Sequence, residues 1–350
     1  MLISICIPHY NRSKYLLKVL DSIELQTYKN IEVIISDDCS TDDSEIVIPQ
    51  YIDGKIKNNS NIIYKYIRHY KNLGYDANLR ASLANGTGDY LFTLGNDDAL
   101  SSPEAIKILV SHINEFNSPD IIFCNYLKDG NTTDINNRAT CTGIVGQGVQ
   151  TAVKIFRSFS FVGGIIIKKP LFDKYNSNLV DGSIFFQIYL ATKIISSGGI
   201  VSSLYDALVL KDIRIANENS NSYLDTLKIK NKKMHAETGG LDQVFNVAYL
   251  GIKDSISIKE MSKVVRYIYS QILIFSYPIW LITYRHAGVY KAAINLALGN
   301  WPSNLVKIKL SIWNRFHIYF VYFVTTIGGL FLPTKLILYF KNYLGRLSKK

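Results

Sequence analysis

Two adjacent carboxylates, Asp97 and Asp98, come directly after the apolar run Tyr90–Leu94 and the residues Gly95 and Asn96. Neighbouring carboxylates repel each other unless a cation lies near them. Mg²⁺ and Mn²⁺ take one or two protein carboxylates and complete their coordination shells with phosphate oxygens and water. The sequence therefore predicts that Asp97 and Asp98 bind Mg²⁺ or Mn²⁺ together with a diphosphate.

The same residues also have a purely structural interpretation, in which Asp98 or Ser101 caps a helix entered near Pro103. However, three other polar clusters also follow apolar runs, namely Pro8–Arg12, Ser36–Ser40 and Asn72–Gly74. In open α/β sheets the ligand binds beyond the carboxyl ends of the strands. Four clusters at such positions favour a ligand site over a single helix cap.

The other three clusters are less specific than the aspartate pair. One carboxylate of Asp37 and Asp38 is expected to accept N–H groups of a nucleobase or ribose, and the alternative is an ordinary Asx-rich turn. By itself, Asn72–Gly74 is only a turn signal. A lone histidine such as His9 more often makes structural hydrogen bonds in a loop than acts as a catalytic base.

Short apolar runs alternate with helical stretches over the first 130 residues, which is the arrangement of βα units. The runs that predict strands are Leu2–Ile7, Ile31–Ile35, Ile62–Ile67, Tyr90–Leu94 and Ile121–Asn125. Helical spacing of apolar residues predicts helices over Ser13–Leu25, Asn78–Asn85 and Pro103–Phe116. The pattern predicts an α/β fold whose mostly parallel sheet has helices on both faces.

The next part of the chain is more varied. The polar segment Asp129–Gly148 predicts a loop or a hairpin, and Asn217–Tyr223 predicts an exposed connection. Apolar runs predict further strands over Phe161–Lys168, Val201–Ser203 and Ala207–Lys211, and a helix over Ile184–Ile195. Beyond Met261 the composition becomes apolar and basic.

Three segments carry a resemblance to a known family: CIPHYNRSKYL, IEVIISDDCSTDDS and NLGYDANLRASLANGTGDYLFTLGNDDAL. In order and spacing they resemble the inverting glycosyltransferases of family 2, which have the Rossmann-like GT-A fold. The resemblance implies an enzyme that transfers a sugar from a nucleotide-sugar donor. The Gly-Asn-Asp-Asp form of the last cluster is more narrowly similar to bacterial O-antigen and capsule transferases, including abequosyltransferase-like enzymes.

The resemblance also implies how the chain is divided. A GT-A catalytic domain is expected over residues 1–215, with a nucleotide-sugar half over 1–125 and an acceptor half over 126–215. The shift in composition, and not the resemblance, predicts a connector over 216–260 and a basic, apolar, helical, membrane-associating region over 261–350.

Individual residues receive roles from the same resemblance. Asp97 matches the metal-binding carboxylate of the DxD motif, with Asp98 beside it, and Asp38 matches a position that contacts the base. The positions assigned to the nucleotide-sugar are, in full, Pro8, His9, Tyr10, Asn11, Arg12, Asp38, Asn72, Gly74, Arg80 and Asn96. Gly95 departs from the pattern, because the family usually has the first Asp of the motif there. That departure argues against strong metal affinity, though not against the fold.

Inversion at the anomeric carbon needs a carboxylate that takes the proton from the acceptor hydroxyl, and the leaving diphosphate needs its charge neutralised. In the family the base lies in the second half of the catalytic domain, which favours Asp181 in LVDGSIFFQIYL. The alternative is that Asp181 only caps the helix that follows it. Gln187 on that helix is expected to face the acceptor, and Asp173 is a second candidate base.

The net charge of +11 is concentrated in residues 261–350, which contain twelve Lys or Arg and no Asp or Glu. Of the 39 basic and 28 acidic residues of the chain, 27 basic and 28 acidic therefore lie in residues 1–260, a net charge of −1. Two aromatic-rich apolar runs, Tyr267–Tyr284 and Ile318–Leu332, lie in the basic region. Such a region suits an anionic membrane surface, and we expect no nucleic-acid partner.

Both runs are shorter than the roughly 20 apolar residues of a spanning helix or are interrupted, and their aromatic residues favour the membrane interface. We therefore predict peripheral or monotopic association with the cytoplasmic face of the bacterial inner membrane. The family analogy implies a glycan acceptor there, linked to undecaprenyl. The alternatives are that the runs are core helices of a small domain, or that Ile318–Phe340 spans the membrane.

Two other functions fit parts of the sequence. One is a GT-A-like domain that has lost catalysis and serves as a membrane-bound assembly partner, for which Gly95 is the main support. The other is a nucleotidyltransferase, which also uses Asp pairs. That enzyme class needs a Gly-rich, basic phosphate loop near the first strand, where CIPHYNRS has no glycine.

Overall fold

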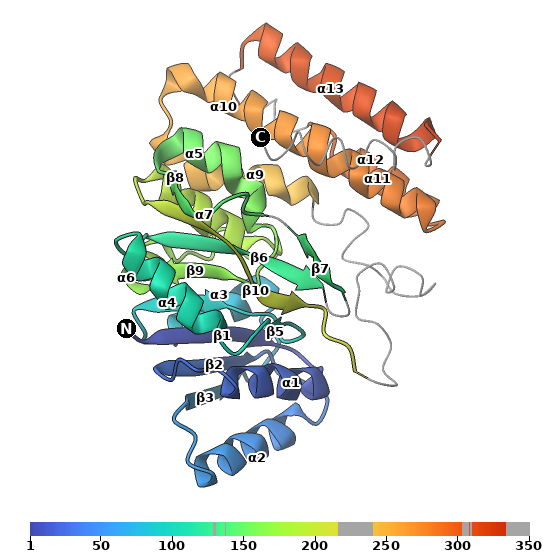
Figure 1. Cartoon of the computed structure of the whole chain (residues 1–350). Coiled ribbons are helices and arrows are strands. Elements are labelled where there is room, and N and C mark those ends of the chain that lie inside the picture. The colour runs from blue at the N-terminus through green and yellow to red at the C-terminus, as the bar shows by residue number, and fades with distance from the viewer. Residues whose placement is uncertain (129–130, 137, 216–240, 303–307, 309, 334–350) are drawn as a thin grey trace. The chain divides into compact units, whose positions relative to one another are not determined.

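The computed structural model describes residues 1–128, 131–136, 138–215, 241–302, 308 and 310–333. The chain divides into two compact units, Met1–Asn219 and Ser220–Lys350 (Figure 1). The predicted connection Asn217–Tyr223, much of the predicted connector and the end of the predicted membrane-associating region, residues 334–350, lie outside the described residues.

Four strands of the first unit pair in parallel, in the order β3-β2-β1-β4. Their bounds are Ile3–His9 for β1, Ile31–Asp37 for β2, Ile63–Arg68 for β3 and Tyr90–Thr93 for β4. The connecting helices are α1 (Ser13–Glu24), α2 (Ser44–Lys57) and α3 (Tyr75–Ala84). The predicted strands and the helices α1 and α3 are confirmed. Sequence reasoning missed α2, which contains Pro49 and buries few apolar side chains.

The sheet continues beyond β4 in the order β9-β6-β10-β5, with β7 paired to β6 and β8 paired to β10. The bounds are Ala99–Leu100 for β5, Ile121–Lys128 for β6, Asn131–Asn136 for β7, Gly143–Gly146 for β8, Ile165–Lys168 for β9 and Val201–Lys211 for β10. β10 joins the two predicted strands 201–203 and 207–211, with a register irregularity between Leu204 and Ala207.

The prediction of a mostly parallel sheet holds for β1 to β4 and for the pair β6–β10, but not for the whole sheet. β9 runs antiparallel to both β4 and β6, and β5, β7 and β8 are also antiparallel to their partners. β6 and β7 are consecutive in the chain, whereas helices lie between the partners of the other antiparallel pairs, so the direction of these strands is set by long-range pairing and not by a direct chain reversal.

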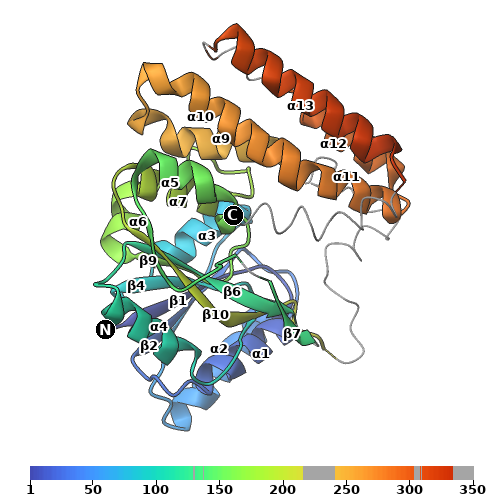
Figure 2. The same cartoon turned by 45° about the horizontal axis from the view of Figure 1, so that its top comes forward.

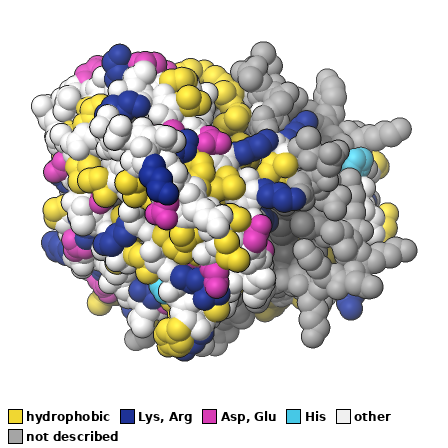
Figure 3. Space-filling model, turned by 90° about the horizontal axis from the view of Figure 1, so that it is seen from below, with side chains coloured by type: hydrophobic (Ala, Val, Ile, Leu, Met, Phe, Trp, Pro, Cys, Tyr) yellow, Lys and Arg dark blue, Asp and Glu magenta, His cyan; other side chains and the backbone are white. Residues whose placement is uncertain are grey.

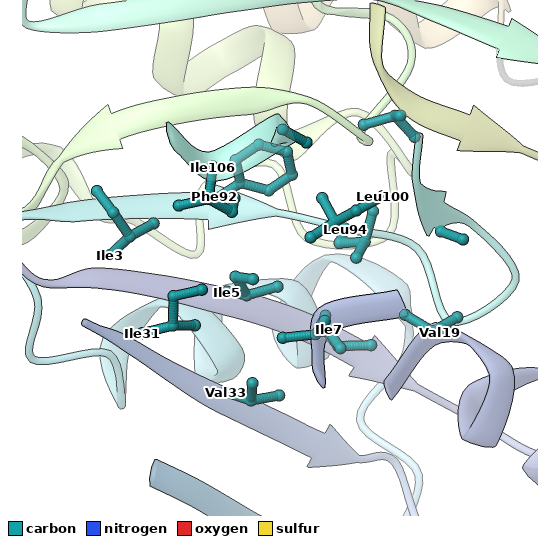
Figure 4. Close-up of a cluster of buried hydrophobic side chains, with 14 of the residues drawn as sticks. Ile3, Ile5, Ile7, Val19, Ile31, Val33, Phe92, Leu94, Leu100 and Ile106 are labelled. Carbon is teal, nitrogen blue, oxygen red and sulfur yellow. The ribbon is translucent and has the colours of Figure 1, made fainter. Parts of the chain in front are cut away.

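Helices cover both faces of the sheet, as predicted. The remaining ones are α4 (Ala105–Glu115), α5 (Gly148–Ile155), α6 (Lys169–Tyr175) and α7 (Phe186–Ser196), with a 3₁₀ turn at Phe156–Phe159. Ile3, Ile5 and Ile7 point to the same face and join side chains of α1, α2 and α4 in one apolar cluster (Figure 4). α3 contacts β1, β2 and α7 on the other face. Removing one such buried isoleucine side chain would cost about 2–5 kcal/mol.

The second unit consists of packed helices in its described part. These are α9 (Leu241–Ile252), a 3₁₀ turn (Lys253–Ser255), α10 (Ile258–Gln271), a π-helical segment (Ile272–Ser276), α11 (Tyr277–His286), α12 (Tyr290–Gly299) and α13 (Ile312–Phe331). Figure 2 shows α10 and α11 end to end, with α13 alongside them.

The two apolar runs of this unit have different surroundings. The first lies on α10 and α11, where Tyr277, Leu281 and Tyr284 are buried against neighbouring helices. Pro278 lacks a backbone N–H, and the π-helical segment directly precedes it. The second run lies on α13. None of the described helices combines the length and the hydropathy that crossing a bilayer would need.

Candidate active site

The four predicted polar clusters meet at one edge of the sheet. Because β1 pairs in parallel with both β2 and β4, the carboxyl ends of these strands lie side by side. His9 is in register with Asp37, and the Asp38 N–H donates to the His9 carbonyl over 2.8 Å. Asn96 Nδ2 lies 3.1 Å from His9 Nδ1, and the Gly74 N–H donates to Asp38 Oδ2 over 3.0 Å.

Strained backbone gathers around the same edge. Residues other than glycine rarely adopt positive φ, and such conformations persist where the surrounding structure fixes them, often at functional sites. The non-glycine residues with positive φ near the four clusters are Asn11 (55°), Arg12 (65°), Cys39 (61°), Ile184 (63°) and Asp212 (54°). Their concentration supports this edge as the functional site.

His9 is a structural centre of the edge. Its side chain is fully buried, and Asn96 donates to Nδ1, so Nε2 carries the hydrogen that is donated to Ser44 Oγ at 2.8 Å. Burial lowers the pKa of His9 to about 4, which keeps the ring neutral. Both ring nitrogens of His9 therefore bind protein groups, and the ring positions Asn96, while the contact of His9 with a nucleotide stays a prediction.

The rest of the first cluster divides into buried and exposed parts. Pro8 is buried within β1, whereas Tyr10 is 45% exposed. Asn11 connects the ends of β1 and β2, because its N–H donates to Ser40 Oγ and its Oδ1 accepts the Thr41 N–H, both over 2.8 Å.

Asp38 is buried, and its carboxylate accepts the N–H groups of Leu73 and Gly74. Burial raises the pKa of Asp38 in spite of these two hydrogen bonds. Asn72 donates in return to the Asp38 carbonyl over 3.2 Å. Asp38 therefore fixes the Asn72–Gly74 turn, and its contact with a nucleotide base stays a prediction.

The two adjacent aspartates have different environments. Asp97 is partly exposed and forms an ion pair with Arg12, so the charge of this carboxylate is balanced by a residue assigned to the nucleotide. Asp98 is buried, and burial next to Asp97 raises its pKa to about 8. The Asp212 N–H donates to Asp98 Oδ1 over 3.2 Å. Asp97 is therefore the more accessible carboxylate of the pair and Asp98 is buried beside it, and the binding of a metal by either one stays a prediction.

The absence of a side chain at position 95 has a steric reason. A Cβ atom at this position would lie 2.6 Å from Asp98 Oδ2 and 3.3 Å from Asp97 Oδ1. Gly163 approaches the same Asp98 oxygen from another side, where a Cβ atom would lie at 3.0 Å. The carboxylate of Asp98 thus occupies the space that a side chain at position 95 would need.

Asp181, the predicted base, forms an ion pair that the sequence did not predict. Asp181 is bound by both ends of the Arg80 guanidinium, with Nε 2.9 Å from Oδ1 and the terminal nitrogen paired with Oδ2. Arg80 was assigned to the nucleotide-sugar and not to the base. The two side chains are only partly exposed, 19% and 29%, so this is more than a surface pair.

Asp173, the second candidate base, does not join the four clusters. It lies on α6, which follows β9, and β9 is antiparallel to β4, so that Lys168 is in register with Tyr90 at the start of β4. Asp173 pairs with Lys169 on its own helix. It is therefore at the opposite end of the strands from Asp97.

Sequence reasoning missed two residues that organise the acceptor half. Asp76 on α3 is buried and accepts the N–H groups of Ile184 and Phe186. Arg138 donates to the carbonyl oxygens of Phe161 and Gly163 over 2.8 and 2.7 Å. A buried acceptor on a helix and an arginine in a polar loop have no distinguishing pattern in one sequence, so neither could have been found.

Gln187 is buried in α7, with Nε2 3.4 Å from the Ser160 carbonyl and Oε1 without a protein partner in the described structure. Its predicted contact with an acceptor remains a prediction.

Comparison with known families decides the classification. Residues 4–180 match the family model described as glycosyl transferase family 2. The chain belongs to glycosyl transferase family 2. The family predicted from the three sequence segments is thereby confirmed.

Curated relatives in the family are bacterial. The chain is 40% identical over 132 residues to abequosyltransferase RfbV of Salmonella typhimurium, a match that covers 37% of each protein. It is 33% identical over 131 residues to the GalNAc(5)-diNAcBac-PP-undecaprenol beta-1,3-glucosyltransferase of Campylobacter jejuni, covering 37% of this chain and 40% of that protein. The chain thus matches well under half the length of these relatives.

Solved structures confirm the GT-A-type fold. The S. aureus TarS 1-349 structure in complex with UDP aligns with 94% of this chain and 89% of that one, with a TM-score of 0.59 and 16% identity. The mannosyltransferase PcManGT from Pyrobaculum calidifontis, in complex with GDP-Man and Mn2+, aligns with a TM-score of 0.53 and 15% identity, covering 99% of this chain and 85% of that one.

The steric account of Gly95 predicts the effect of restoring a side chain there. Gly95→Ala should destabilise the fold by about 1–3 kcal/mol through overpacking, and Gly95→Asp should cost more because it adds a carboxylate beside Asp98. Urea unfolding measures both. Gly54→Ala in α2 is the control, since its Cβ would meet nothing within 4 Å. A Gly95→Asp protein as stable as wild type would show that Asp98 does not fill this space.

Proposed function

We propose that this protein is an inverting glycosyltransferase that transfers a sugar from a nucleotide-sugar donor to a glycan acceptor in the synthesis of a bacterial surface polysaccharide, such as O-antigen or capsule. The observation that carries the proposal is the convergence of Pro8–Arg12, Asp38, Asn72–Gly74 and Asp97 at one sheet edge, inside the family segment. The similarity to an abequosyltransferase supports the O-antigen setting.

A divalent cation, Mg²⁺ or Mn²⁺, is part of this proposal. Within the described residues no group of three or more His, Cys, Asp or Glu side chains could hold a metal by itself. The protein side chains at this site fit an ion whose other ligands are diphosphate oxygens and water, because one partly exposed carboxylate, Asp97, lies at the carboxyl ends of the strands. When bound, such an ion would neutralise charge on the leaving diphosphate.

Arg12 is the protein group that adjusts to the donor. Its guanidinium is 38% exposed and pairs with Asp97. Because a diphosphate is a strong bidentate partner for arginine, we propose that Arg12 transfers from Asp97 to the diphosphate when the donor binds. Asp97 is then free to face the cation.

Asp181 is the proposed base that accepts the proton of the acceptor hydroxyl. The bidentate pair with Arg80 occupies one lone pair of each Asp181 oxygen, and we propose that Asp181 turns one oxygen away from Arg80 so that it faces the acceptor hydroxyl. The partly exposed positions of both side chains allow this change. The base and the metal-facing carboxylate would thus be released from two different arginines.

A lipid-linked acceptor at the cytoplasmic face of the inner membrane completes the proposal. The Campylobacter relative acts, by its name, on an undecaprenol-linked glycan. The face in Figure 3 shows basic and acidic side chains interspersed, in keeping with the net charge of −1 in residues 1–260. The basic excess lies in residues 261–350.

Helix α13 supplies an apolar surface for this role. The exposed residues of the helix are all hydrophobic: Ile312, Trp313, Phe316, Phe320, Phe323, Val324, Ile327 and Phe331. An amphipathic helix that presents large aromatic residues lies in the plane of a membrane interface. We therefore propose peripheral or monotopic binding through this face.

The experiment that tests the function is a thermal-shift screen against UDP-, GDP-, CDP- and dTDP-sugars, with and without Mn²⁺, followed by donor hydrolysis and transfer assays. Stabilisation by one nucleotide class, enhanced by Mn²⁺, and turnover of that donor are expected. Binding without turnover of any donor would instead favour the catalytically impaired assembly partner.

Asp97→Asn should lower kcat by about 10²–10³-fold, because the carboxylate that would hold the cation beside the leaving diphosphate is lost. Steady-state kinetics with the identified donor measures this effect. Asp21→Asn, which removes a carboxylate on α1 paired with Lys55, is the control and should leave kcat unchanged. Near-normal turnover by a folded Asp97→Asn protein would remove Asp97 from the site.

Asp181→Asn should lower kcat by about 10²–10⁴-fold, the usual contribution of a general base, with little change in donor binding. Single-turnover kinetics and donor titration separate the two effects. Asp173→Asn should behave as wild type because it lies at the other end of the strands. If Asp173→Asn lost activity and Asp181→Asn kept it, the assignment of the base would be wrong.

The α13 face should be required for membrane binding. Phe316→Ser with Phe320→Ser and Phe323→Ser should abolish co-sedimentation with vesicles that contain phosphatidylglycerol. Ile63→Ser with Tyr70→Ser, which removes exposed hydrophobic residues from the first unit, should not. Equal binding by the two variants would place the membrane contact elsewhere.

A further inference from the structure

Asp76 connects α3 to a loop more than one hundred residues away in the chain. Its side chain is only 1% exposed. One carboxylate oxygen accepts the Ile184 N–H over 2.8 Å, the other accepts the Phe186 N–H over 3.0 Å, and the backbone of Gly182 also donates to it. All three donors belong to the segment that follows Asp181.

The segment needs such an anchor for two reasons. Phe186 begins α7, and the first N–H groups of a helix have no partners within that helix. Ile184 has φ of 63°, which is strongly unfavourable for a β-branched residue and persists only when its surroundings fix it. Asp76 satisfies the N–H groups on both sides of this strained turn.

Arg80 holds the other end of the same segment. It lies four residues after Asp76 on α3, so the two side chains project from the same face of the helix. Arg80 forms the bidentate pair with Asp181, whereas Asp76 binds the backbone at Ile184 and Phe186. The Asp76 contact is buried and the Arg80 contact is partly exposed, so the first is fixed and the second can be released.

The start of α3 is tied to the nucleotide side of the edge. The Gly74 N–H donates to Asp38 Oδ2 over 3.0 Å, and Asn78 Nδ2 donates to the His9 carbonyl over 3.1 Å. One rigid ten-residue helix therefore contacts the ends of β1 and β2 and the segment that carries Asp181.

We propose that Asp76 is a positioning residue that holds Asp181 in register with the donor side of the site through α3. The proposal rests on the proposed function, in which Asp181 is the base. Asp76 contributes no group to the reaction; it fixes the backbone from which Asp181 projects, and Arg80 sets the resting orientation of the Asp181 carboxylate.

The direct test is hydrogen–deuterium exchange of the peptide that contains residues 182–188, in the full-length protein. Asp76→Asn replaces one acceptor oxygen by a donor, and we expect exchange in this peptide to become at least tenfold faster. Glu32→Gln is the matched control. Glu32 is also a buried carboxylate that accepts backbone N–H groups, those of Thr87 and Gly88, but it lies at the start of β2.

Kinetics give the second measurement. Asp76→Asn should lower kcat at least tenfold while the donor KM changes less than twofold, and Asp76→Glu should recover part of kcat. Glu32→Gln should change neither kcat nor KM, even if it lowers the melting temperature of the protein as much as Asp76→Asn does. An equal loss of kcat in Glu32→Gln, or unchanged exchange of residues 182–188 in Asp76→Asn, would overturn the proposal.

If Asp76→Asn does not fold, Arg80→Lys provides the test, because its site is partly exposed and the positive charge is kept. It should lower kcat more than donor affinity while leaving exchange at residues 184–188 unchanged, since Asp76 still binds them. Faster exchange there would show that Arg80, and not Asp76, is the anchor. The exchange experiment tests only whether Asp76 anchors this segment, whatever the role of Asp181. If Asp181 is not the base, the kinetic predictions fail while the exchange result stands, so the two failures can be told apart.

Discussion

The parallel pairing of β1 with β2 and β4 is the constraint on which the rest of the site depends. It places the ends of three strands at one edge and so joins residues near positions 9, 38 and 96. The Asp38 N–H bound to the His9 carbonyl, and Asn96 bound to the buried His9 ring, fix these strand ends to each other. The partly exposed ion pair of Arg12 and Asp97 lies at this edge.

Much of the fold could be predicted because local patterns agree with tertiary structure. Buried strands such as β1 and β2 are continuous apolar runs, and α1 has its apolar residues at helical spacing. Elements without such patterns were missed, including α2 with its internal Pro49, and so was the antiparallel direction of β9. Strand direction depends on long-range pairing, which a run of four apolar residues does not encode.

The convergence of the four polar clusters could be predicted from the sequence, but the contacts within them could not. Position relative to strand ends singled out Asp38 and Asp97, since topology alone brings such residues to an edge, whereas Arg80 and Asp181 were chosen from the family resemblance. The sequence could not reveal that Arg80 binds Asp181 or that the His9 side chain is fully buried. Such pairings depend on where side chains of distant segments meet, and the partners are separated by about one hundred residues. The charge asymmetry, by contrast, is visible in the sequence, and the structure adds which helix exposes apolar residues.

The close approach of Asp98 to both Gly95 and Gly163 has an evolutionary consequence. We expect positions 95 and 98 to be epistatic, because a Cβ atom at 95 would lie 2.6 Å from the Asp98 carboxylate, and a Cβ atom at 163 would also approach it, at 3.0 Å. A descendant of this sequence could gain the aspartate that the family usually has at position 95 only after the side chain at 98 had shortened or turned away. The order of substitutions is thereby restricted. Within the family, we expect a glycine at 95 to occur together with a buried acidic residue three positions later.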